Sequence, residues 1–214
     1  MDDKLCLLLA LLLNLAIVLL EIMILRKVVE KKNILKFYTF LSNFIALVVG
    51  IVFIGVGLVA LCSNDTIPIW TKGLRFSATH SLASTLLVFA AVLMPLYRKG
   101  AMANEAELFR GISGKYANLI LHYICPVLSI VSFLLFERNP VLEDSQWTLY
   151  AALPSILYWA LYLLLTITHC WREPYGFTQS RETKGESVKG ILLLLLIPIL
   201  SVGIDYLLWW VNVV

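Results

Sequence analysis

Five ionisable side chains stand within strongly apolar stretches of the sequence: Glu21, His80, His122, His169 and Asp205. An ionisable group inside a membrane is costly, so by default it marks a functional site. Two histidines at one depth can supply both axial ligands of a haem iron. A histidine can also act as a general base toward a nearby hydroxyl group, and carboxylates with histidines can carry protons. Which chemistry is available depends on the elements that bring these residues together.

The composition places these residues in a membrane. Of the 214 residues, 60% are hydrophobic and 14% are charged, and the mean hydropathy is +0.87, whereas a soluble domain carries about 25% charged residues. A membrane span needs about 20 mostly apolar residues. Six stretches meet this requirement: residues 5–25, 38–61, 77–96, 117–136, 149–170 and 190–211. The sequence therefore predicts an all-α fold, a bundle of six transmembrane helices that forms one domain over residues 1–214.

Lysine and arginine residues gather in alternate connections between these stretches. Of the 17 in the chain, 13 belong to the first, third and fifth connections, and the other four are Lys4, Lys72, Arg75 and Arg138. Cytoplasmic loops of membrane proteins carry an excess of lysine and arginine. We therefore expect the first, third and fifth loops to be cytoplasmic and both termini to lie outside, as suits a bacterial plasma membrane.

This orientation predicts two polar layers, because an α-helix rises about 1.5 Å per residue. The cytoplasmic layer contains Glu21, Thr39, His122 and His169, and the opposite layer contains His80 and Asp205. Polar faces of the second, fourth and fifth spans converge in the cytoplasmic layer and could line a cavity. Alternatively, these polar side chains could have purely structural roles. Hydroxyl groups in membrane helices often bond to their own backbone, and Glu21 could extend toward the basic first loop.

Small residues continue the polar face of the second span, at Ala46, Gly50 and Gly57. Small side chains on one face let two membrane helices approach closely. We therefore expect this face to pack against another helix.

Three short segments, in order along the chain, carry a resemblance to a known family. Residues 36–43 read Lys-Phe-Tyr-Thr-Phe-Leu-Ser-Asn, residues 118–126 read Asn-Leu-Ile-Leu-His-Tyr-Ile-Cys-Pro, and residues 171–177 read Trp-Arg-Glu-Pro-Tyr-Gly-Phe. On six predicted spans, this set resembles bacterial relatives of the androgen-induced protein family, which includes the androgen-dependent regulator of tissue factor pathway inhibitor. The animal members are membrane-embedded hydrolases of fatty acid esters of hydroxy fatty acids.

The resemblance implies that Thr39 is a nucleophile and His122 its base in an intramembrane hydrolase of such esters or similar acyl esters. Donors from Ser42 or Asn43 would then stabilise the oxyanion. Asn118, Glu21 and His169 would support the site. No metal or cofactor is expected for this reaction, and the implied partner is a membrane lipid or lipid-ester substrate.

The chain also departs from the family pattern. Ser132 and Phe133 stand where bacterial relatives often have an acid followed by tryptophan. The animal proteins have more than one histidine around the second motif, and this chain has only His122 there. If an acid orients the base, Glu21 is the one acid at the predicted depth.

Two other functions fit the same residues. His122 and His169 could ligate one b-type haem of an electron carrier. Alternatively, Glu21 and Asp205 could form a proton-coupled path in a non-catalytic lipid-binding or transport protein, although the chain shows no internal repeat of the kind common in transporters. A net charge of +3 is too small to indicate a nucleic-acid partner. The oligomeric state stays open.

Overall fold

The computed structural model describes residues 2–29, 31, 34–38, 40–93, 116–137, 144–168 and 184–213, with the backbone alone at 36, 92–93 and 184–194. Every regular element in this part of the chain is a helix, which confirms the predicted all-α class. The elements are α1 (Asp3–Lys27), α2 (Ile34–Tyr38), α3 (Leu41–Ser63), α4 (Ile69–Val88), η2 (Phe89–Leu93), η3 (Ile120–Ile124), α8 (Cys125–Phe136), α9 (Gln146–Ile167) and α10 (Lys184–Val213). The segments η2 and η3 are π-helical.

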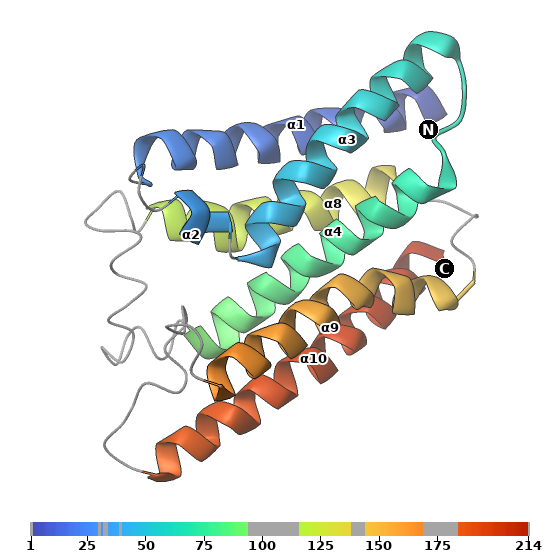
Figure 1. The fold of residues 1–214 in the computed structure, drawn as a ribbon. Coiled ribbons are helices and arrows are strands. Elements are labelled where there is room, and N and C mark those ends of the chain that lie inside the picture. Colours follow the sequence, from blue (N-terminus) through green and yellow to red (C-terminus); the bar gives the residue numbers. More distant parts are fainter. Residues whose placement is uncertain are drawn as a thin grey trace.

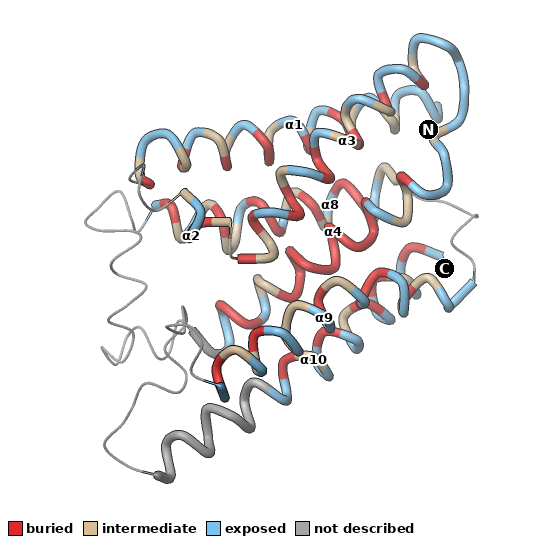
Figure 2. The backbone as a smooth tube through the Cα atoms, viewed as in Figure 1, coloured by how far each residue is buried: buried red, intermediate tan, exposed pale blue. Residues whose placement is uncertain are grey.

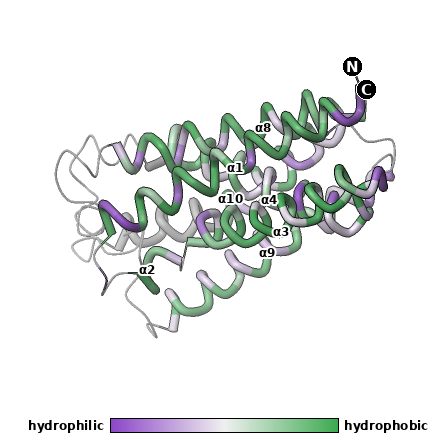
Figure 3. The backbone as a smooth tube through the Cα atoms, turned by 90° about the horizontal axis from the view of Figure 1, so that it is seen from above, coloured by the Kyte–Doolittle hydropathy of each residue, from purple (hydrophilic) through white to green (hydrophobic). Residues whose placement is uncertain are grey.

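Five helices of the described chain are long and apolar enough to cross a membrane, which is consistent with an integral membrane protein. They are Asp3–Lys27, Leu41–Ser63, Tyr116–Phe136, Gln146–Ile167 and a segment of α10, Leu195–Val213. In Figure 3, which is coloured by hydropathy, most of the length of α1 and α8 is hydrophobic (green). The large side chains that these five helices leave exposed are mainly leucine, isoleucine and valine, so the bundle presents to its surroundings the surface that lipid requires.

The remaining long helix, α4, lies at the centre of the bundle (Figure 1) and packs against α3, α8, α9 and α10. Every residue from Arg75 to Ser84 is buried, so all faces of this stretch are covered by other helices (Figure 2). A helix with no face toward lipid needs no apolar stripe. This burial explains why α4 can be richer in serine and threonine than its neighbours and can fall outside the five apolar helices.

The start of α4 corrects one sequence prediction. The third span was predicted to begin at residue 77, with Lys72 and Arg75 in the second loop, but α4 begins at Ile69 and contains both residues. The connection before it is short. Asn64, the residue after α3, adopts the left-handed conformation (φ 59°), and Pro68 directly precedes α4. Arg75 was assigned to a loop because of its charge, yet it is 2% exposed in the structure.

The small residues of α3 confirm the predicted close packing. Gly50 and Gly57 face α1 so closely that a Cβ atom would come within 2.6 Å of Val18 at the first position and 2.5 Å of Leu11 at the second. Ala46 is also buried. The stripe of small residues therefore serves the contact between α1 and α3, as expected for membrane helices.

The second span begins three residues later than predicted. Phe40 has extended backbone angles (φ −81°, ψ 114°), so the helix of α3 starts at Leu41 rather than Tyr38. The short α2 precedes this break, and the Asn43 side-chain amide donates a 3.2 Å hydrogen bond to the Phe37 carbonyl. Asn43 thus ties the end of α2 to the first turn of α3.

Candidate functional site

His122 sits in a π-helical turn and is held on two sides. Its Nδ1 lies 3.1 Å from the Asn118 carbonyl oxygen, and the Phe89 ring stacks on the imidazole with 4.3 Å between centroids. Because a carbonyl oxygen can only accept, Nδ1 must carry the hydrogen of this bond. In the neutral ring Nε2 then holds the lone pair, which is the arrangement that a general base needs.

Pro126 explains why the helix deforms at this position. Proline has no N–H, so the His122 carbonyl, four residues earlier, lacks its α-helical donor. The Cys125 N–H bonds to the Ile120 carbonyl, which is the longer π-type connection. Phe89, which stacks on His122, itself begins the π-helical segment η2. Single π-helical turns inside α-helices are frequent at functional sites, and here two of them meet at one histidine.

His122 lines a small cavity of about 40 Å³ between α3, α4, α9 and α10. One water occupies roughly 10–15 Å³ on this measure, so the space suits a reacting group with one or two waters rather than an acyl chain. Polar side chains contribute much of the wall, and the lining consists of Leu41, Ser42, Ser81, Ser84, Thr85, Val88, His122, Ser155, Tyr158, Trp159 and Ile197.

Most serine and threonine hydroxyls of this cavity already have partners. Ser81 and Ser155 share a 3.3 Å hydrogen bond, and Ser84 accepts from Ser201 at 3.0 Å. Ser42 differs, because its hydroxyl makes no hydrogen bond with any residue that the structure describes. The cavity therefore brings His122, in the tautomer that a base needs, together with the Ser42 hydroxyl group.

The other predicted site residues fall in several places. Thr39 and His169 lie outside the described residues. Asn118 contributes its main-chain carbonyl to His122, and its side-chain oxygen is buried without a hydrogen-bond partner in the described chain. Asn43 is already engaged with the Phe37 carbonyl.

Glu21 is 1% exposed, so it does not extend toward solvent at the first loop, and that structural interpretation is wrong. Its Oε1 is buried without a hydrogen-bond partner among the described residues. The group that holds the His122 ring is the Asn118 carbonyl, so a carboxylate is not what orients this histidine.

His80 and Asp205, predicted to share the opposite layer, are in direct contact. His80 Nδ1 lies 2.9 Å from Asp205 Oδ1, between α4 and α10, and both side chains are fully buried. Neither His80 Nε2 nor Asp205 Oδ2 has a hydrogen-bond partner among the described residues. The pair joins two helices far apart in sequence within the bundle interior.

The sequence prediction missed a polar network at the end of the bundle where α1 begins. Arg75 Nε lies 3.2 Å from Glu137 Oε1, and its Nη1 donates to Thr79 at 2.7 Å and to Ser129 at 2.9 Å. Ser132 donates to the same Glu137 oxygen and accepts a 3.2 Å hydrogen bond from Asn14. The network joins α1, α4 and α8. The spacing of Thr71, Arg75 and Thr79, four residues apart, was the available sign of one polar helical face.

Comparison of the chain with protein-family models, with curated proteins and with solved structures finds no match. The functional argument therefore depends on the residues and their geometry.

Proposed function

We propose that the protein is an integral membrane hydrolase of lipid esters, and that α4 with η2 forms its sixth span. The two segments contain 20 and 5 residues, which corresponds to roughly 37 Å of helix, and a bilayer core is about 30 Å thick. Low hydropathy does not argue against this span, because neighbouring helices cover α4. The excess of lysine and arginine in the odd loops favours placing the His122 end of the bundle at the cytoplasmic face.

One observation carries the proposed chemistry: His122, with its Nδ1 at the Asn118 carbonyl, shares a cavity with Ser42 at the start of α3. The motif resemblance assigns the nucleophile to Thr39, three residues before Ser42. A threonine hydroxyl is a weak nucleophile until a base takes its proton.

In the proposed reaction, His122 Nε2 accepts the Thr39 proton as the hydroxyl oxygen attacks the ester carbonyl carbon. The Ser42 hydroxyl donates to the developing oxyanion, an interaction whose loss typically costs about 10²–10³-fold in rate. The protonated His122 then gives its proton to the leaving alkoxide, and an acyl-threonine remains. Water, deprotonated by His122, hydrolyses this ester and regenerates the hydroxyl group. The substrate class is fatty acid esters of hydroxy fatty acids or similar acyl esters.

The test is hydrolysis of such an ester by purified protein in detergent or nanodiscs, with the released fatty acid quantified by mass spectrometry. Thr39→Ala and His122→Ala are each expected to abolish turnover, and Ser42→Ala to lower it by about 10²-fold. Thr168→Ala is the matched control, because Thr168 is exposed at the same end of the bundle and its hydroxyl bonds back to the Leu164 carbonyl.

Full activity in His122→Ala would refute the proposed base. Full activity in Thr39→Ala with complete loss in Ser42→Ala would move the nucleophile to Ser42 and contradict the role that the resemblance assigns. Each variant is compared by melting temperature, so that a loss of fold is separated from a loss of chemistry.

A further inference from the structure

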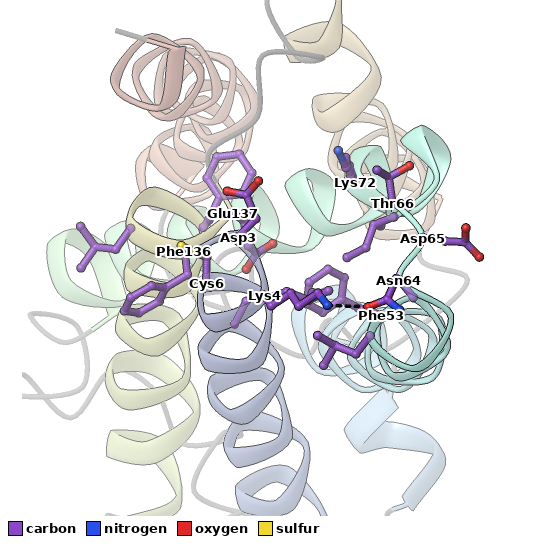
Figure 4. A pocket seen from close by; sticks show the side chains of 17 residues that line it. Asp3, Lys4, Cys6, Phe53, Asn64, Asp65, Thr66, Lys72, Phe136 and Glu137 are labelled. Atoms are coloured by element: carbon purple, nitrogen blue, oxygen red, sulfur yellow. Dashed lines mark hydrogen bonds between the residues drawn. The ribbon is translucent and has the colours of Figure 1, made fainter. Parts of the chain in front are cut away.

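A second, much larger cavity opens at the end of the bundle where α1 begins, remote from His122. Its volume is about 800 Å³, within the range of roughly 300–1,000 Å³ typical of small-molecule sites. Residues from α1, α3, the connection to α4, α4 itself and the end of α8 line it (Figure 4). None of the site residues predicted from the sequence belongs to this cavity.

The walls of this cavity divide into an apolar part and a charged rim. Phe53, Phe133 and Phe136 provide aromatic surface, together with aliphatic side chains that include Leu7 and Leu61. The rim carries polar side chains from the first turn of α1 and from the connection between α3 and α4. An apolar interior with a polar rim matches an amphiphile rather than a fully polar metabolite.

The charges at the rim favour an anionic head group. Lys72 is half-buried at the cavity and makes no hydrogen bond or ion pair with any residue that the structure describes. Lys4 reaches across toward Asn64 and donates to its side-chain oxygen (Figure 4). An ammonium group has three donors, so Lys4 keeps two for a ligand.

The three acidic residues of the lining, Asp3, Asp65 and Glu137, repel an anionic ligand less than three free carboxylates would. Glu137 is paired with the buried Arg75 and accepts from Ser132, so its charge is already compensated. Asp65 points away from the cavity in Figure 4. Asp3 is exposed at the first turn of α1, where water screens it.

We propose that this cavity binds a single-chain amphiphile with a phosphate head group, of the lysophosphatidate type. The phosphate meets Lys72 and Lys4, and the acyl chain lies against Phe53, Phe133 and Phe136. This binding site is independent of the hydrolase chemistry, because it shares no residue with the His122 cavity.

The test measures binding of three probes to the purified full-length protein by native mass spectrometry. Two are ether-linked analogues, which an ester hydrolase cannot cleave, of oleoyl lysophosphatidate and of the uncharged monooleoylglycerol, and the third is the chainless glycerol 3-phosphate. We expect lysophosphatidate to bind most tightly and glycerol 3-phosphate not to bind detectably. Lys72→Gln should weaken lysophosphatidate binding roughly tenfold, as expected for loss of a charged hydrogen bond, and should leave monooleoylglycerol binding unchanged. Equal binding of lysophosphatidate and monooleoylglycerol would overturn the proposal.

A substitution that fills the cavity provides a second arm. Ala60→Leu introduces a larger side chain at a buried lining position and should weaken the binding of both acyl probes. Ala160→Leu, the same change at an exposed position of α9, and Lys27→Gln, at an exposed lysine in the last turn of α1, are the matched controls. His122→Ala should leave the affinity unchanged. Loss of binding in His122→Ala with normal binding in Lys72→Gln and Ala60→Leu would place the amphiphile in the other cavity and refute the assignment.

Discussion

The buried pair formed by Arg75 and Glu137 permits a quantitative test of how α4 is held. Glu137→Gln preserves the shape of the side chain but removes its charge, so Arg75, which is 2% exposed, stays buried without a counter-ion. Removal of one partner from a buried ion pair costs about 3–5 kcal/mol. Arg75 would retain hydrogen bonds to Thr79 and Ser129, so we expect a loss of stability near the lower limit, about 3 kcal/mol.

For a chain of this size, 1 kcal/mol corresponds to roughly 2–4 °C in melting temperature. We therefore expect Glu137→Gln to melt about 6–12 °C lower, as followed by circular dichroism of the purified protein in detergent. Asp65→Asn is the control, because Asp65 is an exposed carboxylate at the same end of the bundle, and it should change stability by no more than about 0.5 kcal/mol.

Adding Arg75→Met to Glu137→Gln should recover part of the lost stability, because no unpaired buried charge then remains. A loss below about 1 kcal/mol in Glu137→Gln is what an exposed ion pair gives, and it would refute the reasoning. Strict additivity of the two substitutions would refute the inference that Arg75 and Glu137 act as one unit.

Two further predictions concern the packing of α4 and the turn at His122. Gly73→Leu should destabilise the fold by about 1–3 kcal/mol, because a Cβ atom at Gly73 would lie 2.4 Å from the Trp147 ring. Gly55→Leu is the control, because the space around its Cβ is open, and it should be neutral or stabilising in the same thermal melt. Equal effects at the two glycines would contradict this packing. Pro126→Ala returns an N–H donor to the His122 carbonyl, so the melting temperature should stay constant or rise while ester hydrolysis falls by about 10²-fold from displacement of the base. Pro198→Ala in α10 is the control, and unchanged hydrolysis in Pro126→Ala would show that the π-helical turn does not position His122.

How much of this structure the sequence predicts depends on what each helix faces. A helix in contact with lipid must be apolar over most of its surface. The hydropathy pattern therefore identifies the five outer helices to within a few residues. The exception is α10, which extends further toward its N-terminus than predicted. The same pattern misplaces the start of α4, because a helix enclosed by protein can carry Arg75, Thr79 and His80 wherever partners exist. Those partners, Ser129, Glu137 and Asp205, come from α8, its end and α10. The sequence of α4 itself does not predict which residues these partners are.

The same distinction separates the two cavities. The contacts that orient His122 are local in sequence. Asn118 lies four residues before it and Pro126 four residues after it, so the sequence alone can predict both. The large cavity combines Lys4, Phe53, Lys72 and Phe136, whose proximity results from tertiary packing alone. Moreover, the sequence predicts Lys72 to be a loop residue, whereas in the structure it belongs to α4, which begins at Ile69. A polar helix at the centre of an apolar bundle is therefore the feature that most changes the interpretation of this chain, because it places Arg75 in the bundle interior and Lys72 in the wall of the large cavity.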